Sequence, residues 1–118
     1  MKAVVTYDGV ANMRTFWEDD ATAPQRLFGV DSLDDPIVAG ISPITHLSKE
    51  DAPFLIFASD SRSGDFVRQA EELSEGLKAA GASAELRLVK NAEHCGSGSL
   101  SEIGRLNLAV NFFDQTLK

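Results

Sequence analysis

The sequence predicts an α/β fold in which a three-stranded parallel sheet is flanked by helices. Three segments with strand character support this prediction: residues 3–7, 54–58 and 84–89. Helical patterns follow the second and third segments after short connections, and such alternation is typical of right-handed crossovers between parallel strands. The length of 118 residues fits a single domain over residues 1–118.

The three predicted strands differ in how they should be covered. Residues 3–7 are followed by the turn signal Asp8-Gly9. Residues 54–58 are uniformly apolar, as expected of a parallel strand covered on both faces. Residues 84–89 alternate between apolar and charged side chains, which indicates a half-exposed strand at an edge of the sheet.

Two helices are predicted, over residues 65–80 and 100–117. The first ends before Gly81, a suitable left-handed cap, and Ser99 with Glu102 forms a candidate capping box for the second. The apolar stripes are Phe66, Ala70, Leu73, Leu77 and Ala80 in the first helix, and Ile103, Leu106, Val110, Phe113 and Leu117 in the second.

A long connection occupies residues 9–53, with helical turns expected around residues 12–17, 24–28 and 34–41. A connection of this length is usually functional or covers another part of the fold. Its large apolar side chains either line a substrate pocket or cover the sheet; they are Phe16, Trp17, Leu27 and Phe28.

The first strand is apolar enough to be central, yet no predicted strand precedes it. Its outer edge therefore pairs with a second copy or with a missing N-terminal half, or it is a short edge blunted by Lys2. The first alternative predicts a homo-oligomer formed through the edge of residues 3–7.

The composition excludes several classes of partner. A formal net charge of −7 disfavours nucleic acid and anionic membranes, both of which bind basic surfaces. The lone Cys95 excludes an internal disulfide and fits a reducing compartment. Without a signal-peptide core or a membrane-spanning stretch, we expect a cytoplasmic protein. We also expect no cofactor and no metal, because neither a phosphate-binding glycine loop nor a spaced ligand cluster occurs.

The candidate chemistry lies after two predicted strands. His94 follows residues 84–89, and Asp60 follows residues 54–58. An acid and a histidine at the carboxyl ends of parallel strands are two thirds of a hydrolase triad, in which the acid orients the imidazole. Asp60 is the first candidate acid and Asp65 the second, although Asp60 could equally be a turn former and His94 an incidental loop residue.

Cys95 is the alternative nucleophile, because a neighbouring histidine can lower a thiol pKa. Adjacent residues in an extended loop point apart, so we do not expect a Cys95–His94 dyad. His46 is expected to be structural.

Several segments together resemble bacterial α/β-hydrolases of the esterase/lipase type. Residues 42–56 read SPITHLSKEDAPFLI, residues 89–94 read VKNAEH, and residues 112–118 read FFDQTLK. Each resembles a stretch in the C-terminal half of that family's domain, and residues 9–53 then correspond to its cap region. The resemblance implies a partial α/β-hydrolase fold with His94 as the catalytic base.

Two departures from the family pattern limit the expected activity. The position of the triad aspartate falls on Arg62, and no G-x-S-x-G nucleophile elbow or oxyanion loop occurs in the sequence. We therefore expect an esterase- or lipase-like protein that is inactive alone or needs a second chain, and that acts on a small ester only when a nucleophile is supplied. The alternative is a non-catalytic homodimerising module.

Overall fold

The computed structural model describes residues 2–60, 64–96 and 98–117. A parallel three-stranded sheet lies at the centre in the order β1-β2-β3, and its strands are β1 (Val4–Tyr7), β2 (Phe54–Asp60) and β3 (Ala84–Lys90). Val4 aligns with Phe54 and Phe54 aligns with Ala84, so the three carboxyl ends point to the same edge of the sheet. The predicted α/β fold is confirmed.

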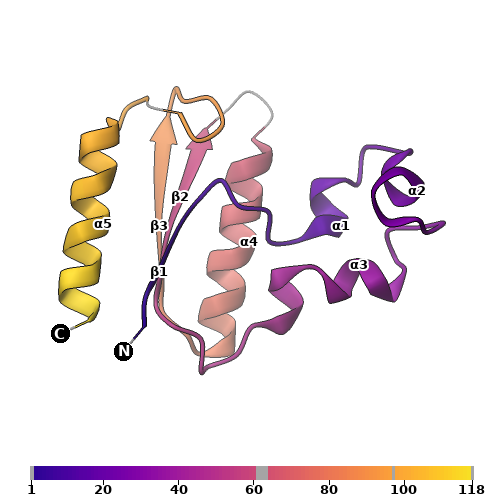
Figure 1. Cartoon of the computed structure of the whole chain (residues 1–118), viewed down its shortest axis with the longest axis horizontal. Helices are drawn as coiled ribbons and strands as arrows, with labels where there is room; N and C mark the ends of the chain where they lie inside the picture. The colour runs from indigo at the N-terminus through magenta and orange to yellow at the C-terminus, as the bar shows by residue number, and fades with distance from the viewer. Residues whose placement is uncertain (1, 61–63, 97, 118) are drawn as a thin grey trace.

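Two long helices cover opposite faces of the sheet: α4 (Asp65–Ala80) and α5 (Glu102–Thr116) (Figure 1). The side chains of β2 alternate between them. Leu55 and Phe57 pack with residues of α5, whereas Ile56 and Ala58 pack with residues of α4. β2 is therefore covered on both faces, which explains its uniformly apolar sequence.

The helix boundaries follow local capping chemistry. Helix α4 ends, as predicted, before Gly81, which adopts a left-handed φ of 94°. Helix α5 begins at Glu102 rather than at residue 100, because Ser101 is the N-cap and its Oγ accepts a hydrogen bond from the Gly104 N–H. The predicted Ser99 cap was wrong: Ser99 Oγ accepts instead from the N–H of Lys90 at 2.9 Å.

Much of the apolar stripe that predicts α5 faces away from the sheet. Ile103 is 71% exposed and Leu106 is 61% exposed. The helix contacts the core mainly through Leu108 and Phe112, which lie on a different side of it. Helix α5 thus carries apolar residues on two sides, and the outer side is exposed in the part of the chain that the structure describes.

The long connection folds into short helices that lie beyond α4: α1 (Met13–Phe16), α2 (Ala23–Phe28), α3 (Pro36–Gly40) and the 3-10 helix η1 (Pro43–His46) (Figure 1). Buried Gln69 of α4 fixes the start of this segment, because its Oε1 accepts hydrogen bonds from the N–H groups of Ala11 and Asn12 at 3.0 and 2.8 Å.

Strands β1 and β3 form the two edges of the sheet, and within the described ranges each pairs with β2 alone. The edge position of β3 agrees with its alternating sequence. None of the helices in the described part of the chain is both long and apolar enough to cross a bilayer.

Candidate active site

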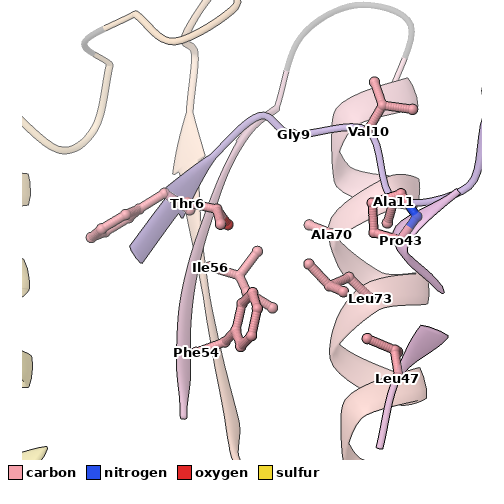
Figure 2. Close-up of a pocket in the computed structure, with 11 residues that line it drawn as sticks. Thr6, Gly9, Val10, Ala11, Pro43, Leu47, Phe54, Ile56, Ala70 and Leu73 are labelled. Atoms are coloured by element: carbon pink, nitrogen blue, oxygen red, sulfur yellow. The ribbon is translucent and has the colours of Figure 1, made fainter. Parts of the chain in front are cut away.

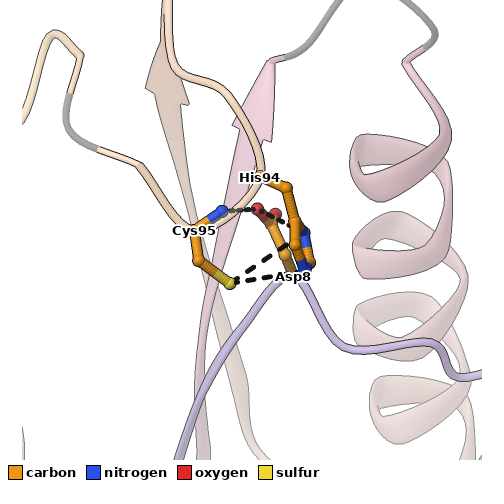
Figure 3. A group of neighbouring side chains, drawn as sticks. All are labelled: Asp8, His94 and Cys95. Carbon is orange, nitrogen blue, oxygen red and sulfur yellow. Dashed lines mark hydrogen bonds and ion pairs between the residues drawn. The ribbon is translucent and has the colours of Figure 1, made fainter.

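The candidate site lies at the carboxyl edge of the sheet. His94 comes from the loop after β3, and Asp8 comes from the turn after β1; the two side chains converge next to Cys95 (Figure 3). Nδ1 of His94 lies 3.4 Å from Oδ2 of Asp8. Strand β2 lies between these two strands, so both loops reach across its end.

Asp8 is a buried carboxylate held by three donors. Its Oδ1 accepts the N–H of Ser59 at 2.6 Å, and its Oδ2 accepts both the Ser59 hydroxyl at 2.5 Å and the Cys95 N–H at 2.6 Å. A buried charge is tolerated only where hydrogen bonds replace its water shell, and these three bonds meet that need. The carboxylate is therefore fixed in position where it faces His94.

His94 is held between Asp8 and an aromatic ring. Its side chain is 57% exposed, whereas that of Asp8 is fully buried. The imidazole stacks on Phe66 with 4.2 Å between ring centroids. A carboxylate beside Nδ1 favours the tautomer with its proton on Nδ1, which leaves Nε2 unprotonated, 3.7 Å from the Cys95 thiol.

The site is built from strained backbone. Asp8, Asn91 and Cys95 have φ values of 55°, 56° and 54°, and they are the non-glycine residues with positive φ among those described. Aspartate and asparagine adopt this left-handed conformation more readily than other residues, whereas cysteine does so at a cost. Such strain is found where the surrounding structure enforces a functional geometry.

The acid beside His94 is not one of those singled out from the sequence. Asp60 is exposed at the last position of β2, aligned with Lys90, and Asp65 lies in the first turn of α4. The described contacts of His94 are with Asp8, Cys95 and Phe66. Arg62 lies outside the described residues.

Asp8 was interpreted from the sequence only as part of a turn. The signal that points to it is the same one used for Asp60, namely an acid directly after a predicted parallel strand. Nothing local distinguishes the two acids, because the difference depends on the register of the strands and on the donors of Ser59.

The prediction that Cys95 and His94 point apart was wrong. Cys95 Sγ lies 3.7 Å from Nε2 and 3.9 Å from Nδ1 of His94. Cys95 has a left-handed φ of 54°, so the two residues do not share the extended conformation in which adjacent side chains point apart. Partial desolvation of the otherwise exposed thiol, and then the charge of Asp8, raise its pKa, with Arg105 opposing them. The thiolate needed for a nucleophile is therefore disfavoured.

Asp8, His94 and Cys95 are also the side chains whose ligand atoms could share a metal ion in the described part of the chain. The sequence had indicated no metal-ligand cluster, because these residues are distant along the chain. His46 is remote from this group: its Nε2 lies 2.8 Å from the carbonyl oxygen of Gly40 at the end of α3, which agrees with a structural role.

Aromatic side chains connect the long connection to the site. Trp17 contacts Phe16 edge to face with centroids 5.0 Å apart, and Phe16 lies 5.7 Å from Phe66, the ring on which His94 stacks. One wall beside the imidazole is therefore aromatic, and the connection contributes to it.

A separate apolar cavity of about 240 Å³ lies between the sheet and α4 (Figure 2). Ile56 and Leu73 face each other across it, and Pro43 and Leu47 close the side toward the long connection. Asp8, His94 and Cys95 do not line it. This cavity is distinct from the polar site.

The parallel sheet, its covering helices and the acid–histidine pair at its carboxyl edge define an α/β-hydrolase type of protein. The profile of the prolyl oligopeptidase family matches residues 1–118, and the chain belongs to this family. No curated protein matches the chain.

Solved esterases share the fold. A truncated carbohydrate esterase from gut microbiota is 25% identical with a TM-score of 0.78; the match covers 98% of this chain and 43% of that one. A bifunctional GH43-CE protein of Bacteroides eggerthii is 22% identical with a TM-score of 0.74 over 100% of this chain and 17% of that one. A thermophilic, propionate-bound esterase of the Planctomycetes species Thermogutta terrifontis is 22% identical with a TM-score of 0.63. The match covers 96% of this chain and 42% of that one.

The chain thus spans less than half the length of the structures it matches. In the described part of the chain, no serine hydroxyl hydrogen-bonds to His94, and the hydroxyl of Ser59 is bound to Asp8. The geometry places an exposed histidine beside a buried carboxylate.

Proposed function

We propose that this chain supplies the base and the orienting acid of an esterase-type hydrolase, and that its serine nucleophile and oxyanion hole come from polypeptide outside these 118 residues. The contact between buried Asp8 and His94 carries the proposal, because such a costly arrangement has an evident use in acyl transfer.

Each residue then has a definite task. Nε2 of His94 takes the proton of an incoming serine hydroxyl as that oxygen attacks the ester carbonyl, and later returns it to the leaving alcohol. Asp8 keeps the proton on Nδ1 and stabilises the imidazolium that forms. The distance of 3.4 Å between Nδ1 and Oδ2 is suitable for tightening once a substrate excludes water.

The substrate class we propose is a small carboxylic ester. The solved relatives named above are described as esterases, and the half-buried rings of Phe16 and Phe66 offer an apolar wall beside the base. Their flat faces suit an acyl group or the carbon face of a sugar.

The test separates the contribution of this chain, the base and its acid, from that of the proposed serine nucleophile. The isolated chain should neither react with a serine-directed fluorophosphonate probe nor hydrolyse a short-chain aryl ester above the rate in buffer. DNA flanking the coding region should encode a G-x-S-x-G segment, and the chain expressed together with that segment should hydrolyse the ester. Stoichiometric labelling of the isolated chain would overturn the proposal.

Variants then assign the roles within the assembled enzyme. His94→Ala and Asp8→Asn should both lower kcat, because one removes the base and the other its orienting charge. His46→Ala is the matched control, since His46 is also an exposed histidine but lies at the end of η1 and contacts Gly40 instead. Equal rates for wild type and His94→Ala would exclude His94 as the base.

A second candidate function is a non-catalytic homodimerising module in the cytoplasm. The open outer edge of β1 and the exposed stripe of α5 support it, because both are surfaces that proteins usually cover. Pairing of β1 with its counterpart in a second copy would lengthen the sheet. A monomer in sedimentation at micromolar concentration would exclude this candidate.

A further inference from the structure

The loop after β3 and the turn after β1 place three metal-ligand types at one point: a carboxylate, an imidazole and a thiol (Figure 3). We propose that Asp8, His94 and Cys95 bind one Zn²⁺ ion, with water as the fourth ligand. Such a site goes beyond ester hydrolysis, and binding to it does not depend on a serine being present.

The spacing fits a tetrahedral ion. Zinc bonds of about 2.0–2.3 Å place neighbouring ligand atoms roughly 3.3–3.6 Å apart. Nδ1 of His94 lies 3.4 Å from Asp8 Oδ2 and 3.9 Å from Cys95 Sγ, and the ligand atoms of all three residues lie within 4.8 Å of one another. The imidazole and the carboxylate already have this spacing, and the exposed thiol has to move toward them to complete the geometry.

The three ligands differ in mobility in a way that suits a reversible site. Asp8 is buried and anchored by Ser59, whereas His94 and Cys95 are exposed and open to an incoming ion. Oδ2 of Asp8 already accepts two hydrogen bonds, so the rotatable Ser59 hydroxyl has to turn away when the metal binds. The Cys95 N–H can remain and orient the carboxylate. The thiol proton leaves to solvent as the Zn–S bond forms.

Zinc at this site has a consequence for catalysis, and this part rests on the proposed function. A metal on Nδ1 displaces the proton that Asp8 otherwise holds there, so the neutral ring carries its proton on Nε2. That nitrogen can then no longer accept the proton of a serine. Zinc binding and general-base action of His94 are therefore mutually exclusive.

The binding test uses the reduced, untagged chain and Co²⁺ as a spectroscopic substitute. Wild type and the control His46→Ala should bind one Co²⁺, with a thiolate-to-metal charge-transfer band in the near ultraviolet that excess Zn²⁺ removes. Cys95→Ser and His94→Gln should bind at least about tenfold more weakly, since loss of even an outer partner costs this much. Absence of the band at micromolar chain and metal, or equal weakening by His46→Ala, would overturn the proposal.

A measurement on the wild-type chain avoids any folding defect of the variants. Zn²⁺, but not Mg²⁺, should slow alkylation of Cys95 by iodoacetamide at least about tenfold, because the bound sulfur is no longer available. An unchanged alkylation rate with saturating Zn²⁺ would refute the site. This result does not depend on ester hydrolysis. The zinc site can therefore be refuted while the proposed function stands, and the proposed function can be refuted while the zinc site stands.

Discussion

The carboxylate of Asp8 faces the imidazole of His94 across 3.4 Å, although the two residues come from opposite ends of the chain. Three hydrogen bonds from Ser59 and Cys95 hold the carboxylate before any substrate arrives. The arrangement is therefore organised in advance, which is the property that allows a histidine to act as a base without reorientation.

Asp8→Asn should destabilise the fold by about 1–3 kcal/mol, because a buried donor loses its acceptor. The asparagine side chain has a single acceptor oxygen, whereas the N–H groups of Ser59 and Cys95 each need one. Urea denaturation measures the change. Asp60→Asn is the matched control, because Asp60 is exposed at the end of β2, and it should stay within about 0.5 kcal/mol of wild type.

The same Asp8→Asn variant should alter the tautomer of His94. Without the carboxylate charge, the proton is no longer held on Nδ1, and long-range ¹H–¹⁵N spectra of the imidazole should show a mixture of tautomers. An unchanged Nδ1–H tautomer would mean that Asp8 does not orient the ring.

The sequence was sufficient for the scaffold because periodicity is a local property. The pattern of residues 54–58 predicts a strand covered on both faces, and that of residues 65–80 predicts an amphipathic helix with a glycine cap. The strand and the helix both lie where predicted. Which acid lies beside His94 cannot be predicted from the local sequence. Asp8 and Asp60 both follow a strand, and only the register and the buried hydroxyl of Ser59 distinguish them.

Helix α5 shows a second limit of periodicity. Its regular stripe correctly predicts a helix, but a pattern of apolar residues does not say what covers them. Leu108 and Phe112 contact the sheet, whereas Ile103 and Leu106 of the stripe are exposed. The sheet accounts for the apolar residues on one side of α5, and a second partner would be needed to cover those on the other side.

The strained backbone at Cys95 predicts an order of stability for two variants. Cys95→Ala keeps a Cβ in the left-handed conformation, whereas Cys95→Gly removes it. The glycine variant should be the more stable by about 1 kcal/mol, the usual cost of a Cβ in this conformation. Thermal or urea unfolding compares the two variants directly. Because both lack the thiol, the loss of its contacts does not contribute to the difference between them. Equal stability would mean that Cys95 is not strained.

The raised pKa of Cys95 predicts its alkylation profile in metal-free buffer. Burial, and then the Asp8 charge, disfavour the thiolate, so the rate should rise at a higher pH than for a thiol in the urea-unfolded chain. Asp8→Asn should lower the midpoint only in part, because the larger contribution, burial, remains. A native midpoint at or below that of the unfolded chain would contradict this cause.

A pair of alanine variants tests which helix face is covered in solution. Leu77→Ala removes a fully buried side chain and should cost about 2–5 kcal/mol. Ile103→Ala, at a site 71% exposed, should stay within about 0.5 kcal/mol. A large loss for Ile103→Ala that grows with protein concentration would instead show that the stripe of α5 is buried in an oligomer.

The loop that carries His94 and Cys95 depends on the absence of a side chain at Gly98. A Cβ there would overlap the carbonyl oxygen of Lys90 and crowd the backbone of Asn91, and backbone atoms cannot move aside as a flexible side chain can. Gly98→Ala should therefore destabilise the chain by about 1–3 kcal/mol. Displacement of the loop should also break the Cys95–Asp8 hydrogen bond and speed alkylation of the thiol.

Gly9→Ala is the matched control, because Gly9 follows Asp8 directly but a Cβ there meets no atom within 4 Å. If the two variants behaved alike in both unfolding and alkylation, the close approach of Gly98 to Lys90 would not be what positions His94 and Cys95.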